Sequence, residues 1–307
     1  MLAEFVHNID PVLIDFGPVQ IRYYGLVFAI TLLVGFAFWR GQMRRGGYPP
    51  AVADGFLVWG VLATIVGARL GHCFFYNAEY YLQNPLDVLW FWQGGLASHG
   101  ATVGLVAATA LYAWRNRIRI VEVMDRFTLS AAVGAAGIRL GNFLNSEIVG
   151  RPTDVAWAVK FLHYGNDAVP VARHPSQLYE FAMGLTVLGL LIVADRLAGR
   201  EKRPLGLMTG LFFVLYFAGR FGVEFFKEAH TPARRSTGLT MGQYLSILPF
   251  VFGVGLLAWA WRKRIPTERS AAAAVARLRE REEQPGRQGE GEAGKASAAK
   301  RRKKRQR

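Results

Sequence analysis

The chain has 307 residues, of which 52% are hydrophobic, yet its formal net charge is +15. Sixteen of its 37 Lys and Arg residues lie between Arg262 and Arg307, so the basic charge and the apolar residues occupy different parts of the chain. This segregation excludes an ordinary soluble domain and predicts a membrane protein.

Seven apolar segments are each long enough to approach the ~20 residues that a helix needs to cross the hydrocarbon layer. They are continuous rather than alternating, which predicts helices and not barrel strands. The predicted spans are Ile21–Trp39, Val52–Phe75, Leu96–Trp114, Val121–Leu144, Gln177–Ala194, Leu205–Phe226 and Met241–Trp261. Residues 1–20 contain no Lys or Arg, so we expect no cleaved signal peptide before the first span.

The distribution of basic residues predicts the orientation of these spans. Lys and Arg gather in the loops after the first, third and fifth spans and in the tail after the seventh. The N-terminal 20 residues and Tyr76–Gly95 contain none. Since loops rich in Lys and Arg remain on the cytoplasmic side, the N-terminus is predicted outside and the C-terminus inside.

Three further segments are predicted outside the spans. The aromatic stretch Tyr80–Trp92 is typical of a segment that lies along the outer membrane surface. Asn145–Ser176 is long enough for a small cap, with strand character at Val155–Phe161. Residues 265–307 are predicted to form a disordered basic tail, suited to anionic lipid headgroups. No folded nucleic-acid-binding module accompanies this charge, so nucleic acid is not expected as a partner.

Several polar residues lie within the predicted spans, at a similar depth near their outer ends. Each ionisable group there costs roughly 2.5–3.5 kcal/mol on insertion scales, so each needs a reason. The residues come from four spans and are Tyr24, His99, Arg139, Asn142, Arg220 and Glu224. Their common depth predicts a functional site in the outer half of the membrane.

Arg139 and Asn142 are three residues apart and therefore share a helix face. Gly134, Gly137 and Gly141 lie beside them. One interpretation is therefore that this face packs closely against a neighbouring helix, and that the side chain of Arg139 only extends to the outer membrane interface. The Asn and Glu residues that follow favour a site instead.

Tyr216, Arg220 and Glu224 are spaced by four and share one side of the sixth span. Arg220 and Glu224 can form an intrahelical ion pair, and Glu224 can also aim Arg220 at a phosphate group. Both interpretations can hold together.

His99 enters the third span from outside and is the natural proton acceptor of the group, although a hydrogen-bonded structural histidine is the alternative. Cys73 is the single cysteine and lies in an apolar run, where it is interpreted as a packed small side chain. No His, Asp or Glu residues have the spacing of metal ligands, so neither a metal nor another cofactor is expected.

Several of these stretches resemble the bacterial phosphatidylglycerol–prolipoprotein diacylglyceryl transferase family. They occur in the family's order over roughly residues 10–262, and only the tail is left over. Ile138 is one departure, since the family usually has Gly near this arginine. The matching stretches are Arg22–Leu26, Gly94–Gly100, Arg139–Glu147 followed by Gly150, Arg173–Glu180, and Tyr216–Phe226.

The resemblance implies an all-α integral membrane fold with seven transmembrane helices and a small periplasmic head. Residues 1–264 would form the membrane domain, with the cap at about 145–176, and 265–307 the disordered cytoplasmic tail. The protein would lie in the bacterial inner membrane with a periplasmic N-terminus. It would transfer the diacylglyceryl group of phosphatidylglycerol to the lipobox cysteine of a prolipoprotein signal peptide. Glycerol 1-phosphate would be released.

By the same resemblance, His99 is the leading candidate to accept the thiol proton, with Tyr24 or water as alternatives. Arg139 and Arg220 would hold the phosphate and stabilise the charge that grows on it. The residues implied in lipid binding are Arg139, Asn142, Asn145, Glu147, Gly150, Tyr216, Arg220 and Glu224.

Two other functions are compatible with charges inside spans. A transporter or lipid scramblase would also place Arg and Glu in the membrane. However, the chain shows no internal repeat, and only Asp195 is expected near the inner face. Another phosphatidylglycerol-consuming enzyme would share the arginines and differ only in its acceptor, so the residues alone do not distinguish it.

Overall fold

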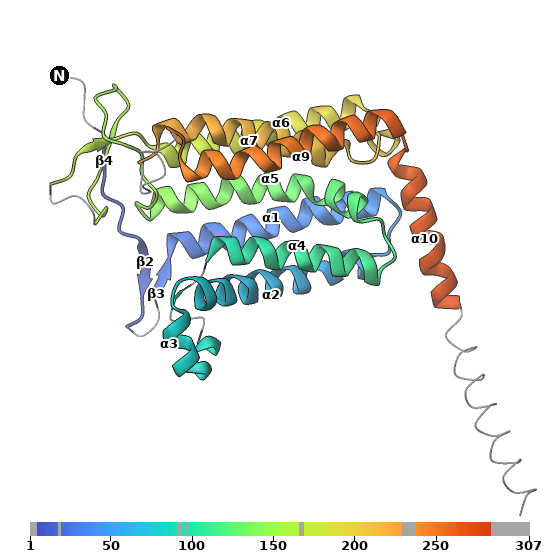
Figure 1. Cartoon of the computed structure of the whole chain (residues 1–307), viewed down its shortest axis with the longest axis horizontal. Helices are drawn as coiled ribbons and strands as arrows, with labels where there is room; N and C mark the ends of the chain where they lie inside the picture. Colours follow the sequence, from blue (N-terminus) through green and yellow to red (C-terminus); the bar gives the residue numbers. More distant parts are fainter. Residues whose placement is uncertain are drawn as a thin grey trace, which may run out of the picture.

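The computed structural model describes residues 5–17, 20–90, 94–95, 97–165, 169–228 and 238–283. The long helices other than α10 run side by side. The strands lie at one end of them, here called the head end, and α10 lies at the other, the tail end (Figure 1). The long helices are α1 (Tyr23–Arg45), α2 (Pro50–Phe75), α4 (Ser98–Arg115), α5 (Ile120–Leu144), α6 (Ser176–Leu197), α7 (Leu207–Val223), α9 (Met241–Lys263) and α10 (Thr267–Glu283). The short elements are β1 (Phe5–His7), β2 (Val12–Asp15), β3 (Gln20–Arg22), α3 (Ala78–Gln83), η1 (Pro85–Leu89), β4 (Val159–Phe161), β5 (Ala172–Arg173), η3 (Arg200–Lys202) and η4 (Glu224–Phe226).

Six segments in the described part of the chain are long and apolar enough to cross a membrane, which makes this a multi-span membrane protein. They correspond to α1, α2, α5, α6, α7 with η4, and α9. The prediction counted a seventh span at α4. This helix has 18 residues, and Ser98, His99 and Arg115 at its ends lower its mean hydropathy. That α4 also spans the membrane remains a prediction.

Helices α2 and α4 pack through glycines spaced four apart. A Cβ on Gly100 would overlap the carbonyl oxygen of Gly67 and lie 2.8 Å from the Cα of Gly71. A Cβ on Gly104 would likewise overlap the carbonyl oxygen of Ala63. Since these neighbours are backbone atoms, larger side chains would separate the helices.

Helix α10 corrects the predicted disorder of the tail for residues 267–283, whereas residues 284–307 lie outside the described residues. Both the N–H and the hydroxyl of Thr267 donate to the carbonyl of Arg203 at 3.0 Å, which attaches α10 to the loop between α6 and α7. Ala271, Ala274 and Val275 then pack into an apolar cluster contributed by α1, α2, α4 and α5. The helical spacing of these small residues gives α10 one apolar face, which the overall composition of the tail does not reveal.

A buried ion network at the tail end corrects the expectation that only Asp195 lies near the inner face. The fully buried side chain of Arg126 pairs with Glu122 at 3.0 Å. Arg203 and Arg45 both pair with Asp195, at 2.7 and 2.6 Å. Glu122 and Arg126 lie within the predicted span Val121–Leu144, near its inner end, whereas Arg45 and Arg203 lie in the basic loops that follow the first and fifth spans. Because its charges pair with one another, the network fastens the loops of the tail end together.

The predicted cap over residues 145–176 contains the expected strand β4, and it also recruits the N-terminal strand β1. Strand β1 pairs parallel with β4, and β4 pairs antiparallel with β5. Strands β2 and β3 form a separate antiparallel pair. Val149, Val159 and Phe161 form the buried core of this head region.

The predicted interfacial stretch is held by a buried arginine of α2. Arg69 donates to the backbone carbonyls of Asp87 and Gly94 at 2.6 Å and of Val88 at 3.0 Å. Residues 91–93 of this stretch lie outside the described residues. Its exposed large side chains are Tyr80, Leu82, Leu86, Leu89 and Trp90.

The packing of α10 predicts different effects for two truncations of the tail. Truncation after Arg264 removes α10, so the apolar cluster loses Ala271, Ala274 and Val275. We expect this truncated protein to unfold at a lower temperature in detergent than the full chain. Tryptophan fluorescence measures the unfolding. Truncation after Glu283 keeps α10 and serves as the control. Equal unfolding temperatures for the two proteins would contradict a stabilising role for this helix.

Candidate active site at the head end

Three helices bring oppositely charged side chains together at the head end. Arg139 comes from the last turns of α5, Glu180 from the start of α6 and Arg220 from the end of α7. The Glu180 carboxylate lies 3.1 Å from Nε of Arg139 and 3.3 Å from Nη1 of Arg220. Its side chain is 1% exposed, so water screens these interactions weakly. The structure therefore joins the two predicted arginines through a carboxylate.

Lys227 adds a third cation to the same carboxylate. Its Nζ donates to Oε1 of Glu180 at 3.0 Å and lies 3.5 Å from Oε2 of Glu224. Burial lowers the pKa of Lys227 below its ordinary value, and the nearby arginines lower it further against the opposing effect of Glu180. Three cations thus face two carboxylates within ion-pair distance. The cluster has a surplus of one positive charge and is suited to an anionic ligand.

The predicted pairing of Glu224 with Arg220 is wrong. Among the described residues no ion pair joins them, and each pairs with another residue instead. Arg220 lies 3.3 Å from the carboxylate of Glu180 on α6, and Glu224 lies 3.5 Å from Nζ of Lys227, so partners outside α7 replace the expected pair.

The turn after α5 gathers the predicted amides around Glu147. Asn145 donates to one carboxylate oxygen of Glu147 at 3.1 Å, and Asn142 to the other at 3.4 Å. Arg139 donates to Oδ1 of Asn142 at 3.4 Å. The exposed carboxylate of Glu147 is thereby linked to the arginine of the cluster.

This turn has a strained backbone that the start of α6 supports. Ser146 and Ile148 have φ angles of 54° and 55°, a region that is unfavourable for a β-branched side chain. Gln177 donates to the carbonyl of Glu147 at 2.7 Å, and the hydroxyl of Ser176 to that of Ile148 at 3.0 Å. The Pro175-Ser176-Gln177 stretch therefore holds Glu147 in place.

Gly150 contributes to the site through its backbone. Its N–H donates to the carbonyl of His174 at 2.9 Å, and it forms a bridge with Lys227. A Cβ here would lie 2.5 Å from the carbonyl oxygen of His174 and 2.7 Å from that of Phe226. Glycine thus allows the turn after α5 to pair with the segment that carries Lys227.

Tyr24 belongs to a further helix, α1, whereas Tyr216 shares α7 with Arg220. The ring of Tyr24 in α1 covers Gly141, where a Cβ would lie 2.8 Å from ring atom Cδ2. Tyr216 lies one turn before Arg220 in α7, and its ring stacks on that of Phe212 with centroids 5.4 Å apart. Tyr24 is therefore beside the helical turn that contains Arg139 and Asn142.

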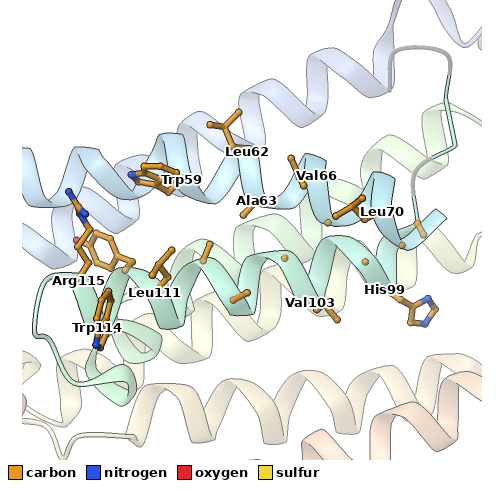
Figure 2. A pocket seen from close by; sticks show the side chains of 18 of the residues that line it. Trp59, Leu62, Ala63, Val66, Leu70, His99, Val103, Leu111, Trp114 and Arg115 are labelled. Atoms are coloured by element: carbon orange, nitrogen blue, oxygen red, sulfur yellow. The ribbon is translucent and has the colours of Figure 1, made fainter. Parts of the chain in front are cut away.

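His99 lies apart from these contacts. It is exposed, at the head end of a groove of about 1490 Å³ between α2 and α4, and its ring points away from α2 (Figure 2). In the described part of the chain no hydrogen bond or ion pair joins His99 to Arg139, Glu180 or Arg220. The structure thus brings the predicted phosphate-binding residues together and leaves the predicted base outside their contacts.

Sequence reasoning missed two members of the cluster. Glu180 lies within a stretch that resembles the family, but it received no role there. The available signal was an acidic residue about one turn inside an apolar span. Lys227 lies just after the sixth predicted span and received no role either. Across the described residues, no group of three His, Cys, Asp or Glu side chains could hold a metal ion.

The fold and the cluster define a multi-span membrane protein with a cationic site at the head end. Residues 11–259 match the family model of prolipoprotein diacylglyceryl transferase. The chain belongs to this family.

Relatives with the name phosphatidylglycerol–prolipoprotein diacylglyceryl transferase match most of the chain. The protein of Nitrosospira multiformis is 38% identical, with 85% of this chain and 90% of the relative covered. That of Nitrosomonas europaea is also 38% identical, over 85% of this chain and 96% of the relative. That of Rhodospirillum rubrum is 41% identical, over 80% of this chain and 90% of the relative.

The shared carboxylate predicts a large loss of stability when its charge is removed. Glu180→Gln keeps the shape of the side chain but leaves Arg139, Arg220 and Lys227 without their common anion. Because removing one partner of a buried ion pair costs about 3–5 kcal/mol, thermal unfolding in detergent should occur at a clearly lower temperature. Asp54→Asn, which breaks the exposed pair with Arg40, is the control and should change little. Similar stabilities of the two variants would contradict the central place of Glu180.

Proposed function

We propose that this protein transfers the diacylglyceryl group of phosphatidylglycerol to the lipobox cysteine of prolipoprotein signal peptides, the first step of lipoprotein maturation. The observation that carries the proposal is the cluster of Arg139, Arg220 and Lys227 around Glu180 in a chain of this family. The single surplus positive charge complements the single negative charge of a phosphodiester lipid.

The chemistry assigns a separate role to each group. The cysteine thiol loses its proton, and the thiolate attacks the glycerol carbon that bears the phosphate. A C–S bond forms while the C–O bond breaks, and the electron pair stays on the phosphate oxygen as glycerol 1-phosphate departs. Arg139 and Arg220 stabilise the charge that grows on this oxygen. Glu180 and Glu224 position the cations, whereas Asn142, Asn145 and Glu147 orient the headgroup.

The proton acceptor is assigned to His99, with Tyr24 or water as the alternatives. The exposed ring of His99 at the head end is accessible to an acceptor peptide. Its separation from the cluster supports a role with the thiol rather than with the phosphate. Tyr24 lies nearer to Arg139 and suits contact with the lipid headgroup.

The proposed orientation places the head end at the periplasmic side of a bacterial inner membrane. The tail end supports this because it carries Arg44, Arg45, Arg115, Arg200 and Lys202, as cytoplasmic loops do. Seven spans follow if α4 crosses with α2. The site then faces the compartment into which prolipoproteins are exported.

The ion network at the tail end does not support the alternative that the protein is a transporter or lipid scramblase. Arg126 and Arg203 there are bound to carboxylates of the same network, and their side chains are fully buried. A lipid path would instead need polar groups that are open to a ligand at several depths. The remaining alternative is an enzyme that uses the same lipid with another acceptor.

The transfer reaction is the first test. Purified protein with phosphatidylglycerol and a lipobox-cysteine peptide should release glycerol phosphate and add a diacylglyceryl mass to the peptide. A Cys→Ser peptide should remain unmodified. Arg139→Ala should abolish the reaction in a protein that still inserts, while Arg40→Ala, at an exposed site, should retain it. Lipid binding with both peptides unmodified would remove the proposed acceptor.

The lowered pKa of Lys227 predicts a pH dependence of lipid binding. Lys227 loses its proton at a lower pH than an ordinary lysine, so the positive surplus of the site disappears as the pH rises through this pKa. The KM for phosphatidylglycerol should therefore rise on the alkaline side. Arginine remains charged across this range, so Lys227→Arg should keep the KM flat.

Measurement of the KM between about pH 7 and pH 10 checks this prediction, because this range lies below the pKa of arginine. Lys202→Arg, at the tail end, is the control and should follow the unmodified protein. If the KM of Lys227→Arg rises at alkaline pH as it does in the unmodified protein, Lys227 does not set the pH dependence of the KM.

A further inference from the structure

The carboxyl group of Glu224 rests against the backbone of Gly242, in the first turn of α9. A Cβ built on Gly242 would overlap the carboxyl carbon and Oε1 of Glu224 and would lie 2.5 Å from Oε2. All three of the nearest atoms belong to this one carboxyl group. The missing side chain of Gly242 therefore forms the space that Glu224 occupies.

The position of Gly242 is fixed by the start of α9. Thr240 is the N-cap, and its hydroxyl accepts from the N–H of Gln243 at 3.2 Å. The side-chain oxygen of Gln243 accepts from the N–H of Thr240 at 2.9 Å, which completes a capping box. Thr240 and Gln243 are both buried. This cap holds the first turn of α9 rigidly beside η4.

Glu224 connects this turn to the charged cluster. Its Oε2 lies 3.5 Å from Nζ of Lys227, which donates to Glu180 at 3.0 Å. Glu180 in turn pairs with Arg139 and Arg220. The groups that face Lys227 thus come from α5, α6, α7 and η4, and Gly242 brings in α9.

The other glycines between α7 and α9 differ from Gly242 in what they face. A Cβ on Gly253 would lie 2.7 Å from Cβ of Phe213 and 3.0 Å from the carbonyl oxygen of Gly210. These contacts let the two helices pack closely. Gly242 has no such neighbour among the three atoms nearest to its Cβ position, so helix packing does not account for it.

We propose that Gly242 is a positioning residue of the transfer reaction, which makes room for the Glu224 carboxylate and so places Lys227 for the lipid phosphate. The inference rests on the proposed function. A side chain at this position would turn the carboxylate away from Lys227. The displaced atoms are the far end of a flexible side chain, and Ala favours the helix over Gly, so the fold would be retained.

The test compares Gly242→Ala with Gly255→Ala in the same helix, where a Cβ meets nothing within 4 Å. Both variants should insert and unfold at the temperature of the unmodified protein. Gly242→Ala should lower kcat/KM for phosphatidylglycerol about tenfold or more, since small misplacements in an active site have large effects. Gly255→Ala should leave it unchanged. Equal activity of the two variants would overturn the proposal.

A second comparison separates positioning from a general disturbance. Glu224→Asp has a carboxylate that is shorter by one methylene group and leaves room for a Cβ at residue 242. In the double variant G242A/E224D the loss of kcat/KM should be smaller than the product of the two single losses, because both changes act on one contact. If the loss of kcat/KM in the double variant equals the product of the two single losses, the contact between Gly242 and Glu224 does not position Lys227.

A readout without catalysis keeps the inference distinct from the proposed function. The rate at which acetic anhydride labels Lys227, followed against pH by mass spectrometry, reports the protonation of its amine. Gly242→Ala should move the midpoint of labelling to lower pH, because Lys227 loses a neighbouring carboxylate, whereas Gly255→Ala should not. If the unmodified protein transfers no lipid, the proposed function fails. If Gly242→Ala leaves the midpoint of Lys227 labelling unchanged, the positioning role of Gly242 is contradicted whether or not the protein transfers lipid.

Discussion

The head end is organised by one buried carboxylate. Glu180 is shared by Arg139, Arg220 and Lys227, and these four residues come from α5, α6, α7 and the segment after η4. Without this anion three cations would repel one another in a region that water reaches poorly. The ends of the helices must therefore meet in one arrangement, and the bridge between Gly150 and Lys227 fixes the turn after α5 to the same point.

Much of the fold was predictable because long apolar runs have few alternative structures in a membrane. The common depth of Arg139, Asn142 and Arg220 likewise predicted one site. The partners within the site were less accessible from the sequence. Glu180 and Lys227 become neighbours only when separate helices pack. Arg220 and Glu224 are spaced by four, yet Arg220 pairs with Glu180 and Glu224 with Lys227. Spacing constrains partners within a helix but not between helices.

Composition was least informative at the tail end. The residues after Ile265 are rich in Ala and charged side chains, as disordered tails are, yet Ala271, Ala274 and Val275 repeat with helical spacing and are buried. Arg203 was likewise predicted to lie in a basic loop, although its side chain is inside the protein. In each case the burial depends on contacts with distant segments, and an average over a window does not contain these contacts.

The shared carboxylate also has a consequence for how the chain is made. If helices enter the bilayer in order from the N-terminus, α5 brings Arg139 in before α6 brings Glu180. A lone arginine in the hydrocarbon costs about 2.5–3.5 kcal/mol on insertion scales. Insertion of α5 is therefore more favourable once α6 supplies Glu180 as a partner for Arg139. Once α6 has paired with α5, the charge of Glu180 favours retention of α7 through Arg220. The residues proposed to bind a lipid phosphate would thus first serve as the signals by which successive helices of the nascent chain recognise one another.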